Sequence, residues 1–171
     1  MVSVSVFDKA TLSSSFIVEA DEKKMAARVA EATIRNNSKL MILFSDGLTT
    51  NGDDVLQSLY PHTNDLMVAG GRAGDSAFQQ TYIFDKENIS DVGAVAACIN
   101  GDITAVNRYY LNWQPIGKIM TITDVEGNIL KTIDNQPVRD VYRKYLGDFV
   151  GDNLPVSNTE FPLIKLGPDG Q

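Results

Sequence analysis

Two short segments of the chain carry residue types that can do chemistry. Residues 45–47 read SDG, and residues 70–75 read GGRAGD. Each follows a short apolar run. If these runs form neighbouring parallel strands, Asp46 and Asp75 lie at one sheet edge, a favoured place for ligands. Their carboxylates would accept hydrogen bonds from a ligand's ammonium or hydroxyl groups, or from backbone N–H groups. Arg72 would meet a ligand carboxylate through its guanidinium fork, or point into solvent.

The glycines of GGRAGD do not match a phosphate-binding loop. A dinucleotide fingerprint is GxGxxG opening a helix, whereas here the pattern is GGxxG and the next segment, SAFQQTYIF, is typical of a strand. The anion site that a helix N-terminus supplies is therefore missing, and no GK[ST] follows. Two interpretations remain open: a tight turn that needs positive φ, and a ligand lying against exposed backbone.

The residues needed for nucleophilic catalysis are incomplete. Ser45 does not lie in a GxSxG elbow, and His62, the only histidine, falls in an expected loop without a visible orienting partner. We therefore expect no enzyme. His62 is either a surface histidine or an axial ligand of haem. One cysteine and one histidine cannot supply the usual ligands of structural zinc.

A third segment, YYLNWQPIG, concentrates aromatic side chains around Trp113, Pro115 and Gly117. Aromatic side chains near a strand end can form the wall of a small-molecule pocket or a partner surface. They can equally form a corner of the core.

Composition limits the classes of function. The chain has 171 residues with 43% hydrophobic and 22% charged side chains, as expected for one globular domain. Its net charge of -7 offers no basic surface for phosphates, so we expect no nucleic-acid partner. No apolar run reaches transmembrane length and a single cysteine precludes an internal disulfide, so we expect a cytoplasmic protein without membrane insertion.

The elements that position these segments follow from hydrophobic periodicity. Expected helices span residues 21–35, 51–60, with Asn51 as a cap, and 136–147. Expected strands span residues 2–7, 15–20, 39–44 (buried on both faces), 66–69, 78–84 and 89–99. Hairpins are expected through Asn100–Gly101, and between residues 115–123 and 128–133. Such consecutive hairpins favour an α+β fold: a mixed, largely antiparallel layered sheet with packed helices.

Three segments together resemble the N-terminal part of the FIST domain: LMILFSDGLTTNGDDVLQSL, VAGGRAGDSAFQQTYIFDKENISDVGAVAACINGDI and NWQPIGKIMTITDVEGNILKTIDNQPVRDVYRKYLG. The resemblance covers about residues 40–147. It implies a domain over residues 1–147 that lacks the family's opening segment, followed by a linker or the start of a further module over 148–171. The family pattern points to these positions: Ser45, Asp46, Gly47, Gly70, Gly71, Gly74, Asp75, Thr81, Trp113, Pro115 and Gly117.

The resemblance implies a non-catalytic sensory domain of prokaryotic signal transduction proteins that binds small ligands such as amino acids and requires no cofactor. Backbone N–H groups of GGRAGD and Arg72 would hold a ligand carboxylate, Asp46 or Asp75 its ammonium group, and the aromatic segment would cover it. The implied partners are output proteins such as a histidine kinase, a cyclic-dinucleotide enzyme or a chemoreceptor. Some members are described as haem-containing nitric oxide sensors, and in that alternative His62 would bind haem.

Overall fold

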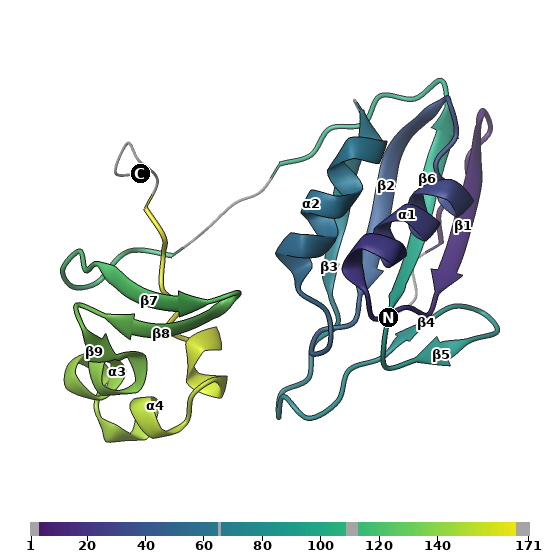
Figure 1. The fold of residues 1–171 in the computed structure, drawn as a ribbon. Helices are drawn as coiled ribbons and strands as arrows, with labels where there is room; N and C mark the ends of the chain where they lie inside the picture. The colour runs from purple at the N-terminus through teal and green to yellow at the C-terminus, as the bar shows by residue number, and fades with distance from the viewer. Residues whose placement is uncertain (1–3, 65, 109–112, 167–171) are drawn as a thin grey trace. The chain divides into compact units, whose positions relative to one another are not determined.

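The computed structural model describes residues 4–64, 66–108 and 113–166 (Figure 1). The chain divides into two compact units, which we call unit 1 (Met1–Tyr109) and unit 2 (Tyr110–Gln171). Both units combine helices and strands, so the predicted α+β class is confirmed. We describe each unit by itself.

Unit 1 is built on a four-stranded mixed sheet in the order β1-β6-β2-β3. The strands are β1 (Ala10–Ile17), β2 (Ser38–Ser45), β3 (Met67–Arg72) and β6 (Ala94–Gly101). β6 runs antiparallel to both of its neighbours, and β2 runs parallel to β3. The two apolar runs that precede SDG and GGRAGD are therefore neighbouring parallel strands, so the condition for placing both segments at one sheet edge is met.

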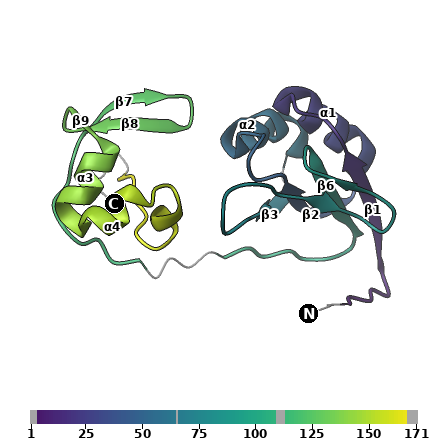
Figure 2. The same cartoon turned by 90° about the horizontal axis from the view of Figure 1, so that it is seen from below.

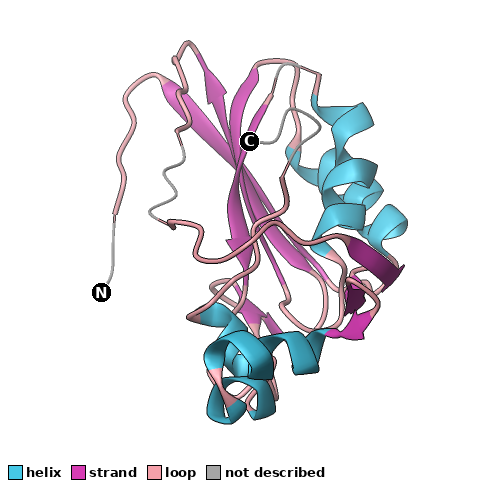
Figure 3. Cartoon of the chain, turned by 90° about the vertical axis from the view of Figure 1, so that its left-hand side faces the viewer, coloured by secondary structure: helices cyan, strands magenta, loops and turns pink. Residues whose placement is uncertain are grey.

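Helices α1 (Glu22–Thr33) and α2 (Gly52–Thr63) cover one face of this sheet, as Figures 2 and 3 show from two sides. Each helix begins at a polar side chain, of which Asn51 was predicted as a cap. The side chain of Asp21 accepts a hydrogen bond from Lys24 N, and that of Asn51 accepts one from Asp53 N. The core between helices and sheet contains Met25, Val29, Met41, Leu43, Val55, Leu59, Ala94, Ala96 and Cys98.

No helix among the described residues of unit 1 covers the other face of the sheet, which we call the open face (Figures 2 and 3). In β2, Met41 and Leu43 are buried against the helices, whereas the alternate side chains of Ile42 and Phe44 are 37% and 48% exposed. The prediction that residues 39–44 are buried on both faces is therefore wrong, because the two helices cover only one face. Apolar side chains follow the open face across β1, β6 and β2, since Phe16 lies opposite Val95 and Val95 opposite Phe44.

Three other predicted elements differ from the structure. The first strand is β1, and residues 4–7 of the expected strand 2–7 are irregular. Asn100–Gly101 is no hairpin turn, because β6 lies between β1 and β2 and pairs with both. Most of the expected strand 78–84 is also irregular, with only β4 (Ile83–Phe84) pairing with β5 (Ile89–Ser90).

Unit 2 contains a small antiparallel sheet followed by helices. Its strands are β7 (Ile122–Glu126), β8 (Ile129–Ile133) and β9 (Gln136–Pro137), and its helices are α3 (Val138–Leu146), α4 (Asp148–Asp152) and the 3-10 helix η1 (Val156–Thr159). The predicted helix α3 is confirmed. A hairpin is also present, but its first strand is β7, whereas most of the expected strand 115–123 is irregular.

Residues 148–161, expected as a linker or the start of a further module, are folded against α3 within unit 2. The Tyr142 hydroxyl of α3 lies 2.7 Å from both Asn158 Oδ1 and the backbone oxygen of Phe161. A methyl group at Gly151 would collide with the side chain and the backbone nitrogen of Arg143, so α4 packs directly on α3. The boundary between the two compact units lies near residue 109 of the chain. That the family domain ends at residue 147 stays a prediction.

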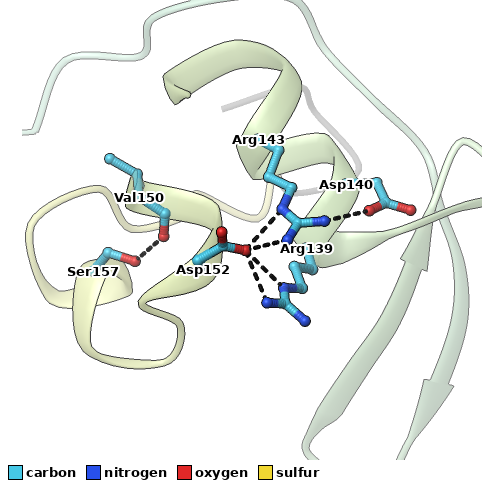
Figure 4. Close-up of polar contacts among 6 residues, drawn as sticks. All are labelled: Arg139, Asp140, Arg143, Val150, Asp152 and Ser157. Carbon is cyan, nitrogen blue, oxygen red and sulfur yellow. Dashed lines mark hydrogen bonds and ion pairs between the residues drawn. The ribbon is translucent and has the colours of Figure 1, made fainter. Parts of the chain in front are cut away.

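Ion pairs reinforce the contact between α3 and α4 (Figure 4). Arg139 Nη2 and Arg143 Nε each lie 2.8 Å from Asp152 Oδ1, and Arg143 also lies 3.9 Å from Asp140. The guanidinium groups of Arg143 and Arg139 hold the pKa of the Asp152 carboxyl below its usual range. Asp152 therefore stabilises unit 2 at pH values above its usual pKa, and this contribution is lost as the pH falls through the lowered pKa.

We expect Asp152→Asn to lower the unfolding midpoint of unit 2 at neutral pH and to flatten its decline in acid. The fluorescence of Trp113, the only tryptophan, reports on unit 2. Asp124→Asn is the matched control, because this exposed carboxylate has no hydrogen bond or ion pair among the described residues. Equal acid profiles for the wild type and Asp152→Asn would contradict the role of the ion pairs.

Candidate functional site

The ends of β2 and β3 bring SDG and GGRAGD side by side. Ser45 pairs with Arg72 in the parallel register, and the N–H of Ala73 donates to the backbone oxygen of Ser45 over 2.8 Å. We call the group formed by Ser45, Asp46, Gly47, Arg72 and Thr81 the junction. The structure therefore brings together five of the residues predicted for the site.

Asp46 is fully buried, and its carboxylate is occupied by backbone N–H groups. Oδ1 accepts from Thr49 N at 2.7 Å and Thr50 N at 3.1 Å, and Oδ2 accepts from Gly93 N at 3.0 Å. Burial alone would raise the pKa of this carboxyl, but the hydrogen bonds from Gly93, Thr49 and Thr50 outweigh burial and hold the pKa below its usual value. Asp46 is thus an ionised anchor for the loop after β2.

Arg72 stabilises the same loop by donating hydrogen bonds to backbone oxygens of the loop. Its Nη2 donates to Gly47 O at 2.6 Å and to Thr50 O at 2.5 Å, and its Nε lies 3.4 Å from Asp46 O. No ion pair between Arg72 and the Asp46 carboxylate is found in the described part of the chain. The guanidinium group expected to hold a ligand carboxylate is therefore bonded to the protein's own backbone.

Two glycines are required where the chain segments meet. The N–H of Gly47 donates to Thr81 Oγ1 at 2.9 Å, and a methyl group at Gly47 would overlap the backbone oxygen of Ala73. Gly70 has a φ of 141°, and a methyl group there would overlap the backbone oxygen of Leu43 on β2. Gly71 differs, because a methyl group there would meet no atom within 4 Å.

Gly74 and Asp75 lie in the loop beyond β3. Asp75 is partly exposed, and its Oδ2 accepts from Gln79 N at 2.7 Å and Gln80 N at 3.3 Å. The hydrogen bonds from Gln79 and Gln80 hold the pKa of the Asp75 carboxyl below its usual range. This turn bends residues 75–80 away from the extended conformation, which explains why the expected strand over 78–84 is mostly absent.

A groove lies on the open face of the sheet beside the junction. We call it the sheet groove; its volume is about 540 Å³ and its lining includes Ile42, Phe44, Ala73, Tyr82, Phe84 and Val95. Tyr82 and Phe84 come from the irregular segment and β4, while Ala73 belongs to GGRAGD. Its side-chain lining is apolar and aromatic apart from the tyrosine hydroxyl. Our sequence analysis missed this groove, since it assigned Ile42 and Phe44 to a strand buried on both faces.

The remaining predicted residues of the aromatic segment, Trp113, Pro115 and Gly117, belong to unit 2. There, Trp113 and Gly117 contribute to a groove of about 480 Å³ that is also lined by Met120, Tyr145 and Phe161. That these three positions contact the same ligand as SDG stays a prediction.

His62 lies in the last turn of α2, not in a loop, and its side chain is exposed. Pro61 is inside the same helix, which therefore extends beyond the end expected at residue 60. A haem that used His62 would need an apolar enclosure around that side chain. The exposed position of His62 provides no such enclosure and therefore does not favour haem binding. The haem alternative stays a prediction.

A comparison with protein families identifies the family of this chain. The family model described as the FIST N domain matches residues 1–136, so the chain belongs to the FIST family. FIST domains are sensory domains of signal transduction proteins. No curated protein matches the chain, and no solved structure matches it. Within the described residues, we find no helix long and apolar enough to cross a membrane.

Proposed function

We propose that this sensory domain binds a small ligand in the sheet groove and that the ligand is an amino acid with an apolar side chain. The observation that carries the proposal is the position of the groove, an apolar hollow beside SDG and GGRAGD at the carboxyl ends of two parallel strands. The junction is the rigid frame of the site, and the groove is the surface that contacts the ligand.

The lining of the groove supports an apolar or aromatic ligand group. Phe44 and Tyr82 are each 48% exposed, and Phe84 is 69% exposed, so their rings are available for contact without unfolding. Burying such rings against an apolar side chain releases water from both surfaces. A charged ligand group would need polar partners, which the apolar lining does not supply.

The polar end of the ligand fits the loop that follows β3. Ala73 lines the groove, and Gly74 and Asp75 follow it directly. The partly exposed Asp75 carboxylate would pair with an ammonium group, and the backbone N–H groups around Gly74 would meet a carboxylate. We assign no ligand contact to Asp46 or Arg72, whose polar atoms are bonded to the backbone.

We expect the domain, once it has bound its ligand, to regulate a signalling output protein, such as a histidine kinase, a cyclic-dinucleotide enzyme or a chemoreceptor. A non-catalytic role is supported by the chemistry of the junction. Ser45 is buried, its hydroxyl lies 3.2 Å from the backbone oxygen of Asp46, and the Asp46 carboxylate is fully used by backbone N–H groups. Neither side chain is placed to react with a substrate.

A panel of the twenty amino acids in a thermal-shift assay tests the proposal. We expect an apolar or aromatic amino acid to raise the unfolding temperature, and Phe44→Ala or Phe84→Ala to weaken its binding about tenfold or more, because each removes an exposed aromatic wall. Tyr60→Ala is the matched control, since Tyr60 is 78% exposed but lies on α2. An equal shift in the wild type and in all three variants would refute the sheet groove as the site. The absence of any shift in the wild type would refute an amino acid as the ligand.

A further inference from the structure

β1 is an edge strand without the features that usually protect such an edge. It is the outermost strand of the four-stranded sheet (Figure 1), and its eight residues, ATLSSSFI, contain no charge and no proline. Its register with β6 is unbroken over its whole length, so no bulge interrupts it. Exposed edges in native proteins are usually blunted by charges, prolines or bulges. An unblunted edge offers its backbone groups to another strand.

The hydrogen-bonding pattern of β6 shows which backbone groups of β1 point away from the sheet. The N–H of Asp46 donates to Gly93 O at 2.9 Å, so residue 93 points its polar backbone groups toward β2. Alternate residues of an antiparallel strand bond to opposite neighbours, so Ala94, Ala96 and Cys98 point toward β1. Their partners are Ile17, Ser15 and Ser13. The backbone N–H and C=O groups of Leu12, Ser14 and Phe16 therefore point outward, away from β6.

We propose that two copies of this chain pair through antiparallel β1 strands, with Ser14 opposite Ser14 across a two-fold axis. In this register Leu12 of one copy lies opposite Phe16 of the other, so the three outward-facing residues all enter hydrogen-bonded pairs. Both of these apolar side chains lie on the open face, where Leu12 is 61% exposed. The pairing would continue the apolar surface of one open face into that of the second copy.

Charge complementarity supports this register. Lys9 and Glu19 are the first charged residues on either side of β1, and they lie at equal distances in sequence from Ser14. In the proposed register, Lys9 of each copy lies opposite Glu19 of the other copy. A shift by two residues in either direction separates them. Glu19 already lies 3.8 Å from Arg28, so the lysine of the second copy would add to an existing ion pair.

The paired edges would form a small interface. Eight residues a side is well below the roughly 20–30 of a standard stable interface, so we expect a weak dimer that forms with rising concentration. Sedimentation velocity of the full chain over a concentration series measures this association. We expect Ser14→Lys to raise the dissociation constant at least about tenfold, because two lysines would face each other at the axis. Tyr60→Lys on α2 should leave it unchanged.

A charge exchange tests the register. Lys9→Glu and Glu19→Lys should each raise the dissociation constant about fivefold, and the double variant should restore most of the wild-type value. Circular dichroism of each variant checks that the fold is kept. A wild-type chain that stays monomeric, or association that persists unchanged in Ser14→Lys, would overturn the proposed pairing. A double variant that binds no better than the single ones would overturn the register.

Discussion

Replacing Gly70 by alanine is expected to destabilise unit 1 by at least about 3 kcal/mol, the largest effect that we foresee for a single methyl group. Two causes act together. The φ of 141° is rarely adopted by residues with a side chain, and the added methyl group would overlap the backbone oxygen of Leu43 on the neighbouring strand. Relief would require β3 to separate from β2, which would break the junction.

Gly71→Ala is the matched control, one residue further along the same strand. A methyl group at Gly71 meets no atom within 4 Å, so we expect a change of about 1 kcal/mol or less. Urea denaturation followed by circular dichroism measures both variants, with Trp113 fluorescence reporting separately on unit 2. Similar midpoints for Gly70→Ala and Gly71→Ala would contradict the close approach of β3 to β2 at Gly70.

Asp46→Ala is expected to destabilise unit 1 by about 3 kcal/mol, because it leaves the N–H groups of Thr49, Thr50 and Gly93 without their acceptor in a buried site. Asp46→Asn should cost less, since its remaining oxygen still accepts from one side, but its NH₂ group would face a backbone N–H on the other. Asp102→Ala is the matched control, because that carboxylate is exposed and has no partner among the described residues.

The same carboxylate predicts a pH dependence. The pKa of Asp46 is lower in the folded chain than its usual value, so its contribution is present at neutral pH and is lost as the pH falls through the lowered pKa. We expect unit 1 of the wild type to lose more stability than that of Asp46→Asn between about pH 5 and pH 2. Parallel profiles over this range would contradict the ionised, hydrogen-bonded state of Asp46.

The sequence alone could not show whether Asp46 and Arg72 contact a ligand or stabilise the fold. The acid and the arginine next to glycine-rich turns indicated a ligand site, and the parallel register indeed places SDG beside GGRAGD. The Asp46 carboxylate in fact accepts from the N–H groups of Thr49, Thr50 and Gly93, and Arg72 donates to the backbone oxygens of Gly47 and Thr50. Gly93 and Arg72 reach this loop from distant parts of the chain, which no local pattern predicts. We infer that the junction holds the loops after β2 and β3 in place beside the groove, and that the ligand contacts other residues.

In the fold, too, features set by local sequence could be predicted, whereas features set by contacts between distant parts of the chain could not. Helices α1 and α2 could be predicted, since their apolar faces and the caps Asp21 and Asn51 are local features. The place of β6 could not, because Asn100–Gly101 has the local chemistry of a hairpin turn, whereas pairing with strands far along the chain decides its role. The turn around Asp75 likewise depends on hydrogen bonds to Gln79 and Gln80 that the alternating pattern conceals.

This distinction matters for interpreting variants in signalling assays. A loss of response in Asp46→Ala or Gly70→Ala would follow from a damaged frame and would not identify a ligand contact. Phe44 and Phe84 are the informative positions, because their rings line the groove and are 48% and 69% exposed. Their replacement should change ligand affinity with little effect on the stability of the ligand-free domain.

The ligand site is tested most directly by NMR titration of the ¹⁵N-labelled chain with the amino acid that gives the largest thermal shift. We predict saturable changes in chemical shift that are concentrated around Ile42, Phe44, Tyr82 and Phe84, with the loop at Gly74 and Asp75 also affected. Changes that centre instead on Trp113 and Tyr145 in unit 2, or the absence of any saturable change, would contradict the sheet groove as the binding site.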